Sequence, residues 1–301
     1  MSYTLQQSPP TAKPPAAVSV SPHLSDKLSD DLFQLLRKFI YEKTGIFFAD
    51  NKKYLLESRV NRRVAALGMD SFLTYSNALM NGQAKTEISH LINSITINET
   101  FFFRNEPQFS VLEQSMLPEL IMKRKEDGTN KIRIWSAACS TGEEPYSIAI
   151  MIKDKFQSRF PFMKFEVVGT DINTQVLDTA RRGIYKDYAV RNVPKDYIEK
   201  YFRRDGDKFF LVDEIKQMTD LKQVNLFDKP VMRSMRNFDI VFAANVLIYF
   251  DINSKQNVVS SMYDSINKGG YFFVGYSETL YGLTQAFKPV HFDKAIAYRK
   301  E

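Results

Sequence analysis

The spacing of apolar positions divides the chain into a helical first third and a longer part in which strands and helices alternate. Apolar residues recur every three or four positions in residues 32–40, 52–67 and 72–95, which predicts amphipathic helices packed as a small bundle. Gly45 stands where the first of these helices should end. We therefore expect an all-α N-terminal domain over residues 25–95.

The remainder, residues 108–301, has the pattern of a doubly wound, Rossmann-like α/β sheet, because short β-branched runs are each followed by a helical pattern. A helix is expected from Asp251 to the glycine pair at residues 269–270, and the last strand should return antiparallel. The strands are predicted near residues 132–135, 165–170, 224–227, 238–246, 271–274 and 295–299.

Two segments depart from this simple alternation. An Asp-Gly turn at residues 205–207, followed by the apolar run 209–212, predicts a small β-hairpin subdomain at about residues 185–220. Residues 96–107 link the two domains and hold three consecutive phenylalanines beside Arg104. Since linkers are usually polar and mobile, we expect this one to pack over another part of the protein.

The composition excludes several classes of protein. The 301-residue chain has a net charge of +6, and its one cysteine, Cys139, rules out an internal disulfide. Neither a C-x-x-C motif nor a histidine cluster indicates a metal site. No run approaches the roughly 18 apolar residues that cross a bilayer, so we expect no membrane insertion and a cytoplasmic location. Proline-rich residues 1–24 are predicted to be a disordered tail.

A loop of small residues, 136–142, joins the first predicted strand to the next helix, and such a loop lets the backbone approach a ligand closely. It is not the G-x-G-x-x-G motif that binds a pyrophosphate, and Glu143 and Glu144 place negative charge where a phosphate needs positive charge. The loop predicts a pocket for an uncharged or cationic cofactor such as S-adenosylmethionine, with an ordinary α/β turn as the alternative. We interpret Cys139 as a small hydrophobe rather than a methyl acceptor.

Asp171 ends the second predicted strand. An acidic residue at this place typically accepts hydrogen bonds from both ribose hydroxyls of a nucleoside cofactor. The alternative is that Asp171 caps the helix that follows, and the sequence leaves both interpretations open.

The predicted helix over residues 52–67 concentrates positive charge. Lys52, Arg59, Arg62 and Arg63 fall within roughly a 100° arc beside its apolar face. This pattern indicates a docking surface that binds an acidic substrate or partner, with a merely solvated face as the alternative.

Six motifs stand in one order at sensible spacing: N-E-T-F-F-F-R-N-E, A-A-C-S-T-G-E-E-P-Y-S, V-G-T-D-I, V-N-L-F-D, N-V-L-I-Y-F-D and G-Y-S-E. Together they resemble the CheR-type chemoreceptor glutamate O-methyltransferases of bacterial chemotaxis, over about residues 33–299. The resemblance implies methyl transfer from S-adenosylmethionine, leaving S-adenosylhomocysteine, to glutamate side chains on the cytoplasmic helices of chemoreceptors.

The resemblance also implies a set of site residues. Arg104 and Tyr249 would lie near the transferred methyl group, with a structural linker salt bridge and a core aromatic as the respective alternatives. The basic helix would then dock the receptor. The positions that would contact the cofactor are Asn98, Thr100, Arg104, Glu143, Asp171, Asn225, Leu226, Asn245 and Val246.

The residue inventory agrees with this chemistry. A glutamate carboxylate has an ordinary pKa of about 4.3, so it is ionised at neutral pH and needs no general base. The three histidines, His23, His90 and His291, would be a poor supply for acid–base catalysis. We expect an enzyme that works as a monomer by orienting its substrates in a dry site.

Some members of this family bind a short peptide at the receptor's C-terminus through the β-subdomain, which in those members carries a G-x-G-P loop. Here residues 201–212 read Y-F-R-R-D-G-D-K-F-F-L-V, with one glycine, no proline and a shorter turn. A tight hairpin leaves less room for an added peptide strand. We therefore predict that the protein does not need the receptor tether.

Three other functions fit parts of the sequence. A methyltransferase acting on nucleic acid would use the basic helix to grip phosphates, but A-N-V-L-I-Y stands where base methyltransferases tend to carry N-P-P-Y or D-P-P-Y. We expect no nucleic-acid partner. The missing glycines count against a nicotinamide oxidoreductase, and the intact motifs count against a non-catalytic interaction module.

Overall fold

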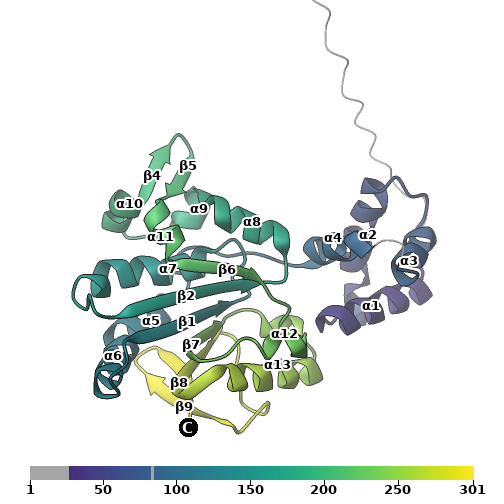
Figure 1. Ribbon diagram of the computed structural model, residues 1–301. Helices are drawn as coiled ribbons and strands as arrows, with labels where there is room; N and C mark the ends of the chain where they lie inside the picture. The colour runs from purple at the N-terminus through teal and green to yellow at the C-terminus, as the bar shows by residue number, and fades with distance from the viewer. Residues whose placement is uncertain (1–26, 83–84) are drawn as a thin grey trace, which may run out of the picture.

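The computed structural model describes residues 27–82 and 85–301, so the predicted N-terminal tail lies outside the described residues. Four helices form the N-terminal bundle, to one side of the sheet (Figure 1). They are α1 (Asp30–Thr44), α2 (Lys53–Ala66), α3 (Phe72–Met80) and α4 (Lys85–Ile95). Their apolar faces share one core, in which Leu36, Leu56, Val60, Val64 and Tyr75 are fully buried.

The ends of α1 follow from its sequence. The hydroxyl of Ser29 accepts a hydrogen bond from the Leu32 amide, and Gly45 ends the helix in the left-handed region with φ of 72°. A Cβ atom at Gly45 would lie 2.5 Å from the ring of Phe227. The predicted helix end is confirmed, and the glycine also lets the sheet domain approach this turn closely.

The central sheet has the order β6-β2-β1-β7-β8-β10-β9. The first five of these strands run parallel, and β10 pairs antiparallel with both β8 and β9. The strands are β1 (Lys131–Ala137), β2 (Lys164–Asp171), β6 (Thr219–Gln223), β7 (Phe238–Ala243), β8 (Ile266–Val274), β9 (Phe287–Phe292) and β10 (Ala295–Lys300). The predicted fold class and the antiparallel last strand are confirmed.

Helices cover both faces of this sheet, because side chains alternate along the strands between two hydrophobic layers. On one face Ile134 and Phe273 pack with α5 (Glu106–Val111), α6 (Leu117–Glu126) and α7 (Glu143–Ile152). On the other, Trp135 and Phe272 pack with α12 (Lys229–Met232) and α13 (Ile252–Ser265). The remaining regular segments are α8 (Thr174–Arg182), α11 (Asp213–Gln217), the 3-10 turns Asp50–Lys52 and Leu247–Tyr249, and the π-helical turns Leu112–Met116 and Lys153–Gln157.

The predicted hairpin is part of a three-stranded antiparallel sheet with the order β3-β5-β4. Its elements are β3 (Ile184–Lys186), α9 (Asp187–Val190), α10 (Lys195–Tyr201), β4 (Phe202–Asp205) and β5 (Lys208–Leu211), seen above the central sheet in Figure 1. Asp205 pairs with Lys208, so Gly206 and Asp207 form a two-residue turn, with φ of 60° at the glycine. The tight turn expected from the sequence is present.

Three predicted boundaries are wrong, and the first is the end of the strand predicted over residues 238–246, because β7 stops at Ala243. Residues 224–227 are not a strand; the strand is the preceding β6, whose polar sequence reflects its exposed position at the sheet edge. Helix α13 stops at Ser265, and Gly269 and Gly270 lie inside β8. A Cβ atom at Gly270 would lie 2.7 Å from the Asp239 carbonyl oxygen, so this glycine serves close strand packing rather than a helix end.

No helix within residues 27–82 and 85–301 is long and apolar enough to cross a membrane. The same described ranges hold no group of three or more histidine, cysteine, aspartate or glutamate side chains placed to bind a metal ion.

Candidate functional site

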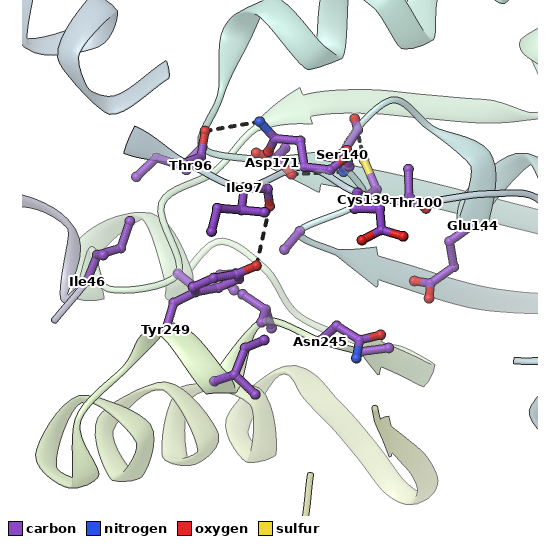
Figure 2. Close-up of a pocket in the computed structure, with 18 of the residues that line it drawn as sticks. Ile46, Thr96, Ile97, Thr100, Cys139, Ser140, Glu144, Asp171, Asn245 and Tyr249 are labelled. Carbon is purple, nitrogen blue, oxygen red and sulfur yellow. Dashed lines mark hydrogen bonds between the residues drawn. The ribbon is translucent and has the colours of Figure 1, made fainter. Parts of the chain in front are cut away.

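A cavity of about 260 Å³ lies where β1, β2 and β7 end, at the carboxyl edge of the sheet (Figure 2). Its walls come from the linker between residues 95 and 105, the loop after β1, and the segments that follow β2, β6 and β7. Thr44 and Ile46 of the N-terminal bundle also line it. All of the predicted cofactor residues except Glu143 line this one cavity, as does Tyr249.

The loop after β1 forms the floor. Ala138, Ser140 and Gly142 have φ of 56°, 51° and 92°, so three residues of this short loop lie in the left-handed region and the chain turns tightly. A Cβ atom at Gly142 would lie 2.8 Å from Ala180, which makes glycine necessary there. Cys139 is buried, and burial, with Asp171 nearby, raises the pKa of its thiol well above the ordinary value. A protonated, buried thiol agrees with its interpretation as a small hydrophobe.

Asp171 is held by backbone amides from two segments. Its Oδ2 accepts from the Ser140 amide at 2.8 Å, and its Oδ1 accepts from the Asn173 amide at 2.8 Å. Asn173, not Asp171, caps α8, because the Asn173 side chain accepts from the amides of the first turn. The capping alternative for Asp171 is therefore wrong. Burial raises the pKa of Asp171, while the two amide bonds oppose that rise.

The acidic residue in the cavity wall after the β1 loop is Glu144, the neighbour of the predicted Glu143. Glu144 accepts from the Ser136 hydroxyl at 2.7 Å, whereas the Glu143 carboxylate accepts from the Thr141 hydroxyl at 2.6 Å, outside the lining. Burial raises the pKa of each carboxyl to about 7. Consecutive residues on a helix point about 100° apart, so the rotation of α7 about its axis decides which one faces the cavity.

The linker packs over the sheet domain, as its phenylalanines suggested. Phe102 is fully buried, and its ring lies 4.8 Å from that of Tyr185 and 5.2 Å from that of Phe202. The backbone carbonyl oxygen of Asn98, a predicted cofactor residue, accepts from the Ser140 hydroxyl at 2.8 Å. The linker is thereby fixed across the cavity floor.

Arg104 and Tyr249 line the cavity from different segments. Nη1 of Arg104 donates to the Glu99 carbonyl at 2.8 Å, so its hydrogen bond goes to backbone rather than to the carboxylate of a salt bridge. Tyr249 is half-buried, and its hydroxyl points toward the Ile97 carbonyl at 3.5 Å (Figure 2). The core-aromatic alternative for Tyr249 does not describe this position.

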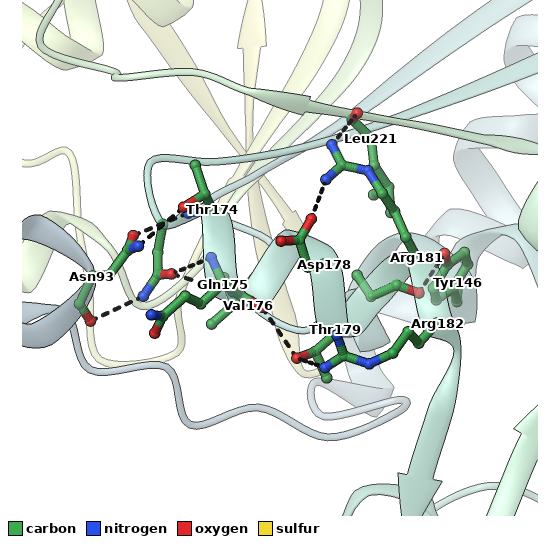
Figure 3. Close-up of polar contacts among 12 residues, drawn as sticks. Asn93, Tyr146, Thr174, Gln175, Val176, Asp178, Thr179, Arg181, Arg182 and Leu221 are labelled. Carbon is green, nitrogen blue, oxygen red and sulfur yellow. Dashed lines mark hydrogen bonds and ion pairs between the residues drawn. The ribbon is translucent and has the colours of Figure 1, made fainter. Parts of the chain in front are cut away.

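Contacts between the domains lie at and beside the cavity, and no pattern in the sequence predicts them. The Asn225 side chain donates to the Lys43 carbonyl at 2.7 Å, and Ile46 forms an isolated antiparallel bridge with Phe250. Asn93 of α4 accepts from the Thr174 amide at 3.1 Å and donates to the Thr174 hydroxyl at 3.0 Å (Figure 3). These asparagines lie far in the sequence from the residues they bind, so no local sequence pattern predicts the contacts.

The four basic residues predicted for docking fall into two groups, one hydrogen-bonded within the bundle and one exposed. Nε and Nη2 of Arg63 donate to the two carboxylate oxygens of the buried Glu87, at 2.8 and 2.7 Å. Arg59 donates to the Ser94 carbonyl at 2.7 Å. Lys52 and Arg62 are exposed. Arg63, one of the four predicted docking residues, therefore has a structural contact, because its guanidinium neutralises a buried carboxylate, and its docking role stays a prediction.

Comparison with known proteins shows what this chain is similar to. Residues 98–296 match the family described as CheR methyltransferase, SAM binding domain, and residues 31–96 match CheR methyltransferase, all-alpha domain. Chemotaxis protein methyltransferase 2 of Vibrio cholerae is 34% identical over 275 residues, which cover 91% of this chain and 94% of that protein. The chemotaxis protein methyltransferase of Borreliella burgdorferi is 35% identical over 261 residues, covering 86% and 92%. That of Salmonella typhimurium is 34% identical over 264 residues, covering 86% and 88%.

Proposed function

This chain belongs to the CheR methyltransferase family, and from that premise we propose that it methylates glutamate side chains on the cytoplasmic helices of chemoreceptors, with S-adenosylmethionine as the methyl donor. The observation that carries the proposal is one cavity at the carboxyl edge of the sheet, which gathers the predicted cofactor and catalytic residues, except Glu143, from four separate segments. Ligands of open α/β sheets bind at this edge.

The residues of the cavity fit this cofactor. The buried Asp171 presents a hydrogen-bond acceptor suited to ribose hydroxyls, and Glu144 adds a second acidic group to the wall. The floor is a tight turn that admits close approach, yet it has no phosphate-binding glycine motif. Such an interior favours a cationic nucleoside without phosphates. When bound, S-adenosylmethionine supplies a methyl group carried on a sulfonium.

We assign Arg104 and Tyr249 to the reacting end of the cavity. Of the three nitrogens of Arg104, only Nη1 donates a hydrogen bond to another described residue. The other two nitrogens are left to orient an incoming carboxylate. Tyr249, on the facing segment, limits the position of the same group and covers the cavity against water. The proposed cofactor contacts are those that line the cavity with Asp171: Asn98, Thr100, Arg104, Asn225, Leu226, Asn245 and Val246.

The chain has to orient the substrate rather than activate it. With the cofactor bound, a carboxylate oxygen would take the methyl group from the sulfonium, and the products would be a neutral ester and a neutral thioether. Because the nucleophile is already ionised, no proton has to leave, and none of the cavity residues is asked to act as a base. Opposite charges cancel along this path, which a site with little water favours.

The exposed cations of α2 and of the 3-10 turn before it support receptor docking. Lys52 and Arg62 point into solvent, where they attract an acidic surface over several ångströms. Arg59, partly buried, adds charge beside them. We assign the N-terminal bundle, residues 25–95, to this docking role and propose that the enzyme acts as a monomer.

We also propose that methylation needs no tether at the receptor's C-terminus. The turn between β4 and β5 has only two residues, so there is little loop against which a peptide strand can lie. Titration with a receptor C-terminal pentapeptide should give no heat at micromolar concentrations. Micromolar binding, for example along the outer edge of β4, would show that the short turn is no obstacle and would end this part of the proposal.

The proposal as a whole is tested by incubating the protein and labelled S-adenosylmethionine with receptor-rich membranes. We expect base-labile methyl esters on peptides from the cytoplasmic helices of receptors, and loss of the label with Asp171→Ala. Label in nucleic acid instead of receptor peptides, or no binding of the cofactor by calorimetry, would overturn the proposed function.

A further inference from the structure

The G-Y-S-E motif follows β8, and its acidic residue, Glu278, lies outside the lining of the cavity. We propose that Glu278 is a positioning residue for methyl transfer, which holds the segment after β7 in the shape that presents Asn245 and Tyr249 to the cavity. The inference rests on the proposed function, because those two residues matter to it as members of the site.

The geometry that carries this inference is a carboxylate surrounded by backbone amides. Oε2 of Glu278 accepts from the Asn245 amide at 2.7 Å and from the Gly275 amide at 2.7 Å, and Oε1 accepts from the Ile248 amide at 3.1 Å. Two of these donors belong to the segment after β7 and the third to the end of β8. Hydrogen bonds to an ionised acceptor are roughly twice as strong as neutral ones. One side chain thus ties the ends of two neighbouring strands together.

The segment after β7 needs such support because its backbone is not in an ordinary conformation. Asn245 has φ of 62°, in the left-handed region that non-glycine residues occupy only when the surroundings hold them there. The next turn, Leu247–Tyr249, is a single 3-10 turn, too short to be stable alone. Ile248, whose amide binds Glu278, lies inside that turn and directly before Tyr249.

The residue that begins the motif fits the same interpretation. A Cβ atom at Gly275 would lie 2.6 Å from Oε2 of Glu278, 2.8 Å from the Asn245 amide nitrogen and 2.9 Å from its side-chain nitrogen. Only glycine leaves room for the carboxylate and Asn245 to meet at this point. The first and last residues of G-Y-S-E therefore serve one contact, while Tyr276 and Ser277 between them are exposed.

The test compares Glu278→Gln with the wild-type protein. An amide nitrogen donates and cannot accept, so the isosteric variant loses at least one of the bonds to the segment after β7. We expect kcat to fall roughly 10- to 100-fold, since a displacement of about 1 Å can cost that much, with weaker binding of S-adenosylhomocysteine. Glu199→Gln, an exposed glutamate of α10, is the control matched in charge and shape and should behave as wild type.

A double-mutant cycle separates positioning from a merely structural role. If Glu278 acts through Asn245, the Glu278→Gln and Asn245→Ala double variant should lose no more kcat than the worse single variant, because coupled residues are not additive. Multiplicative losses, an unchanged kcat in Glu278→Gln, or a loss explained by its folded fraction would each overturn the inference. Should Glu278→Gln fail to fold, Glu278→Asp, which keeps the charge but is one methylene shorter, decides by the same cycle.

Failure of this inference is distinguishable from failure of the proposed function. Wild-type protein that binds S-adenosylhomocysteine and methylates receptors, together with an equally active Glu278→Gln variant, sinks only the role of Glu278. Wild-type protein that does neither sinks the proposed function itself.

Discussion

The cavity and the outer face of α2 both depend on charged side chains, but the two regions hold their charges in opposite ways. In the cavity, Asp171 is buried and bound by two backbone amides, and Glu144 is bound by a hydroxyl. Arg62 on α2 and Lys52 in the 3-10 turn directly before it are exposed. A buried, hydrogen-bonded charge acts at short range and resists salt, whereas an exposed charge acts at longer range and is screened within about 10 Å at 0.1 M salt.

Arg63 shows that helix position alone does not assign a residue to one region or the other. It lies in the same basic stripe as Arg62, but it is bound to Glu87, whose side chain is 3% exposed. Its contribution to the free energy of unfolding should therefore resemble that of a buried charge. Substitutions in the two regions test this contrast between buried and exposed charges. We expect the largest effect where a substitution disturbs the most deeply buried charge and the smallest where it removes an exposed one.

The largest effect is expected from Arg63→Ala, which leaves the buried Glu87 carboxylate with the Tyr75 hydroxyl as its one remaining side-chain partner among the residues that the structure describes. Removing one member of a buried ion pair typically costs about 3 kcal/mol or more in the free energy of unfolding. Chemical denaturation measures this loss directly. Arg62→Ala, one position earlier and exposed, is the control and should change stability by less than about 0.5 kcal/mol. Equal stabilities of the two variants would place Arg63 back among the docking residues.

The second-largest effect is expected from Asp171→Ala. If Asp171 accepts hydrogen bonds from the ribose hydroxyls, as we propose, its loss should weaken S-adenosylmethionine binding by about 2 kcal/mol, because charge-assisted hydrogen bonds are lost. Calorimetric titration of the folded variant gives the value. Asp178→Ala, an exposed aspartate of α8, should bind the cofactor as wild type does. Unchanged affinity in Asp171→Ala removes Asp171 from the cofactor site.

The fold and the place of the cavity follow from the sequence because they depend on local patterns. Alternation of strand and helix predicts the sheet, and parallel strands bring their carboxyl ends, including Asp171, to one edge. The segment at residues 224–227 was misassigned because edge strand β6 is polar and the apolar residues come just after it. A pattern of apolar residues reports burial, and burial is not the same as membership of a strand.

The rest depends on contacts between residues distant in sequence. Arg63 and Glu87 are 24 positions apart, and Asn93 and Thr174 are 81 apart. No local period records such pairs. The choice between Glu143 and Glu144 is different, because it turns on how α7 is rotated against the sheet, and both residues fit any sequence rule for that position.

A smaller effect should appear as a pH dependence of the cavity. Burial raises the pKa of Glu144 to about 7 from an ordinary 4.5, so its carboxyl becomes ionised as pH rises through about 7. The preference for cationic S-adenosylmethionine over neutral S-adenosylhomocysteine should therefore grow between pH 6 and 8, on the order of tenfold, equivalent to one pKa unit. Parallel titrations of both ligands measure it.

Glu144→Gln should abolish that pH dependence. Because the pKa of Glu144 is raised in the folded protein, this residue contributes stability below about pH 4.5 that is lost as pH rises through about 7. The free energy of unfolding of Glu144→Gln should therefore increase, relative to that of the wild-type protein, as pH approaches neutrality. A ligand preference that stays constant with pH in the wild-type protein would show that Glu144 does not face the charged end of the cofactor.

The smallest effect should come from the exposed cations. Lys52→Ala with Arg62→Ala should lower kcat/KM for receptors about threefold to fivefold at low salt, since exposed ion pairs contribute roughly 0.5 kcal/mol each, while S-adenosylhomocysteine binding stays unchanged. At about 0.5 M salt the wild-type rate should fall to that of the variant, because the Debye length is then only a few ångströms. The control removes two exposed cations at the opposite edge of the sheet, Arg159 and Lys164. If the control loses as much as the test variant, net charge rather than α2 guides docking, and the face of α2 is simply solvated.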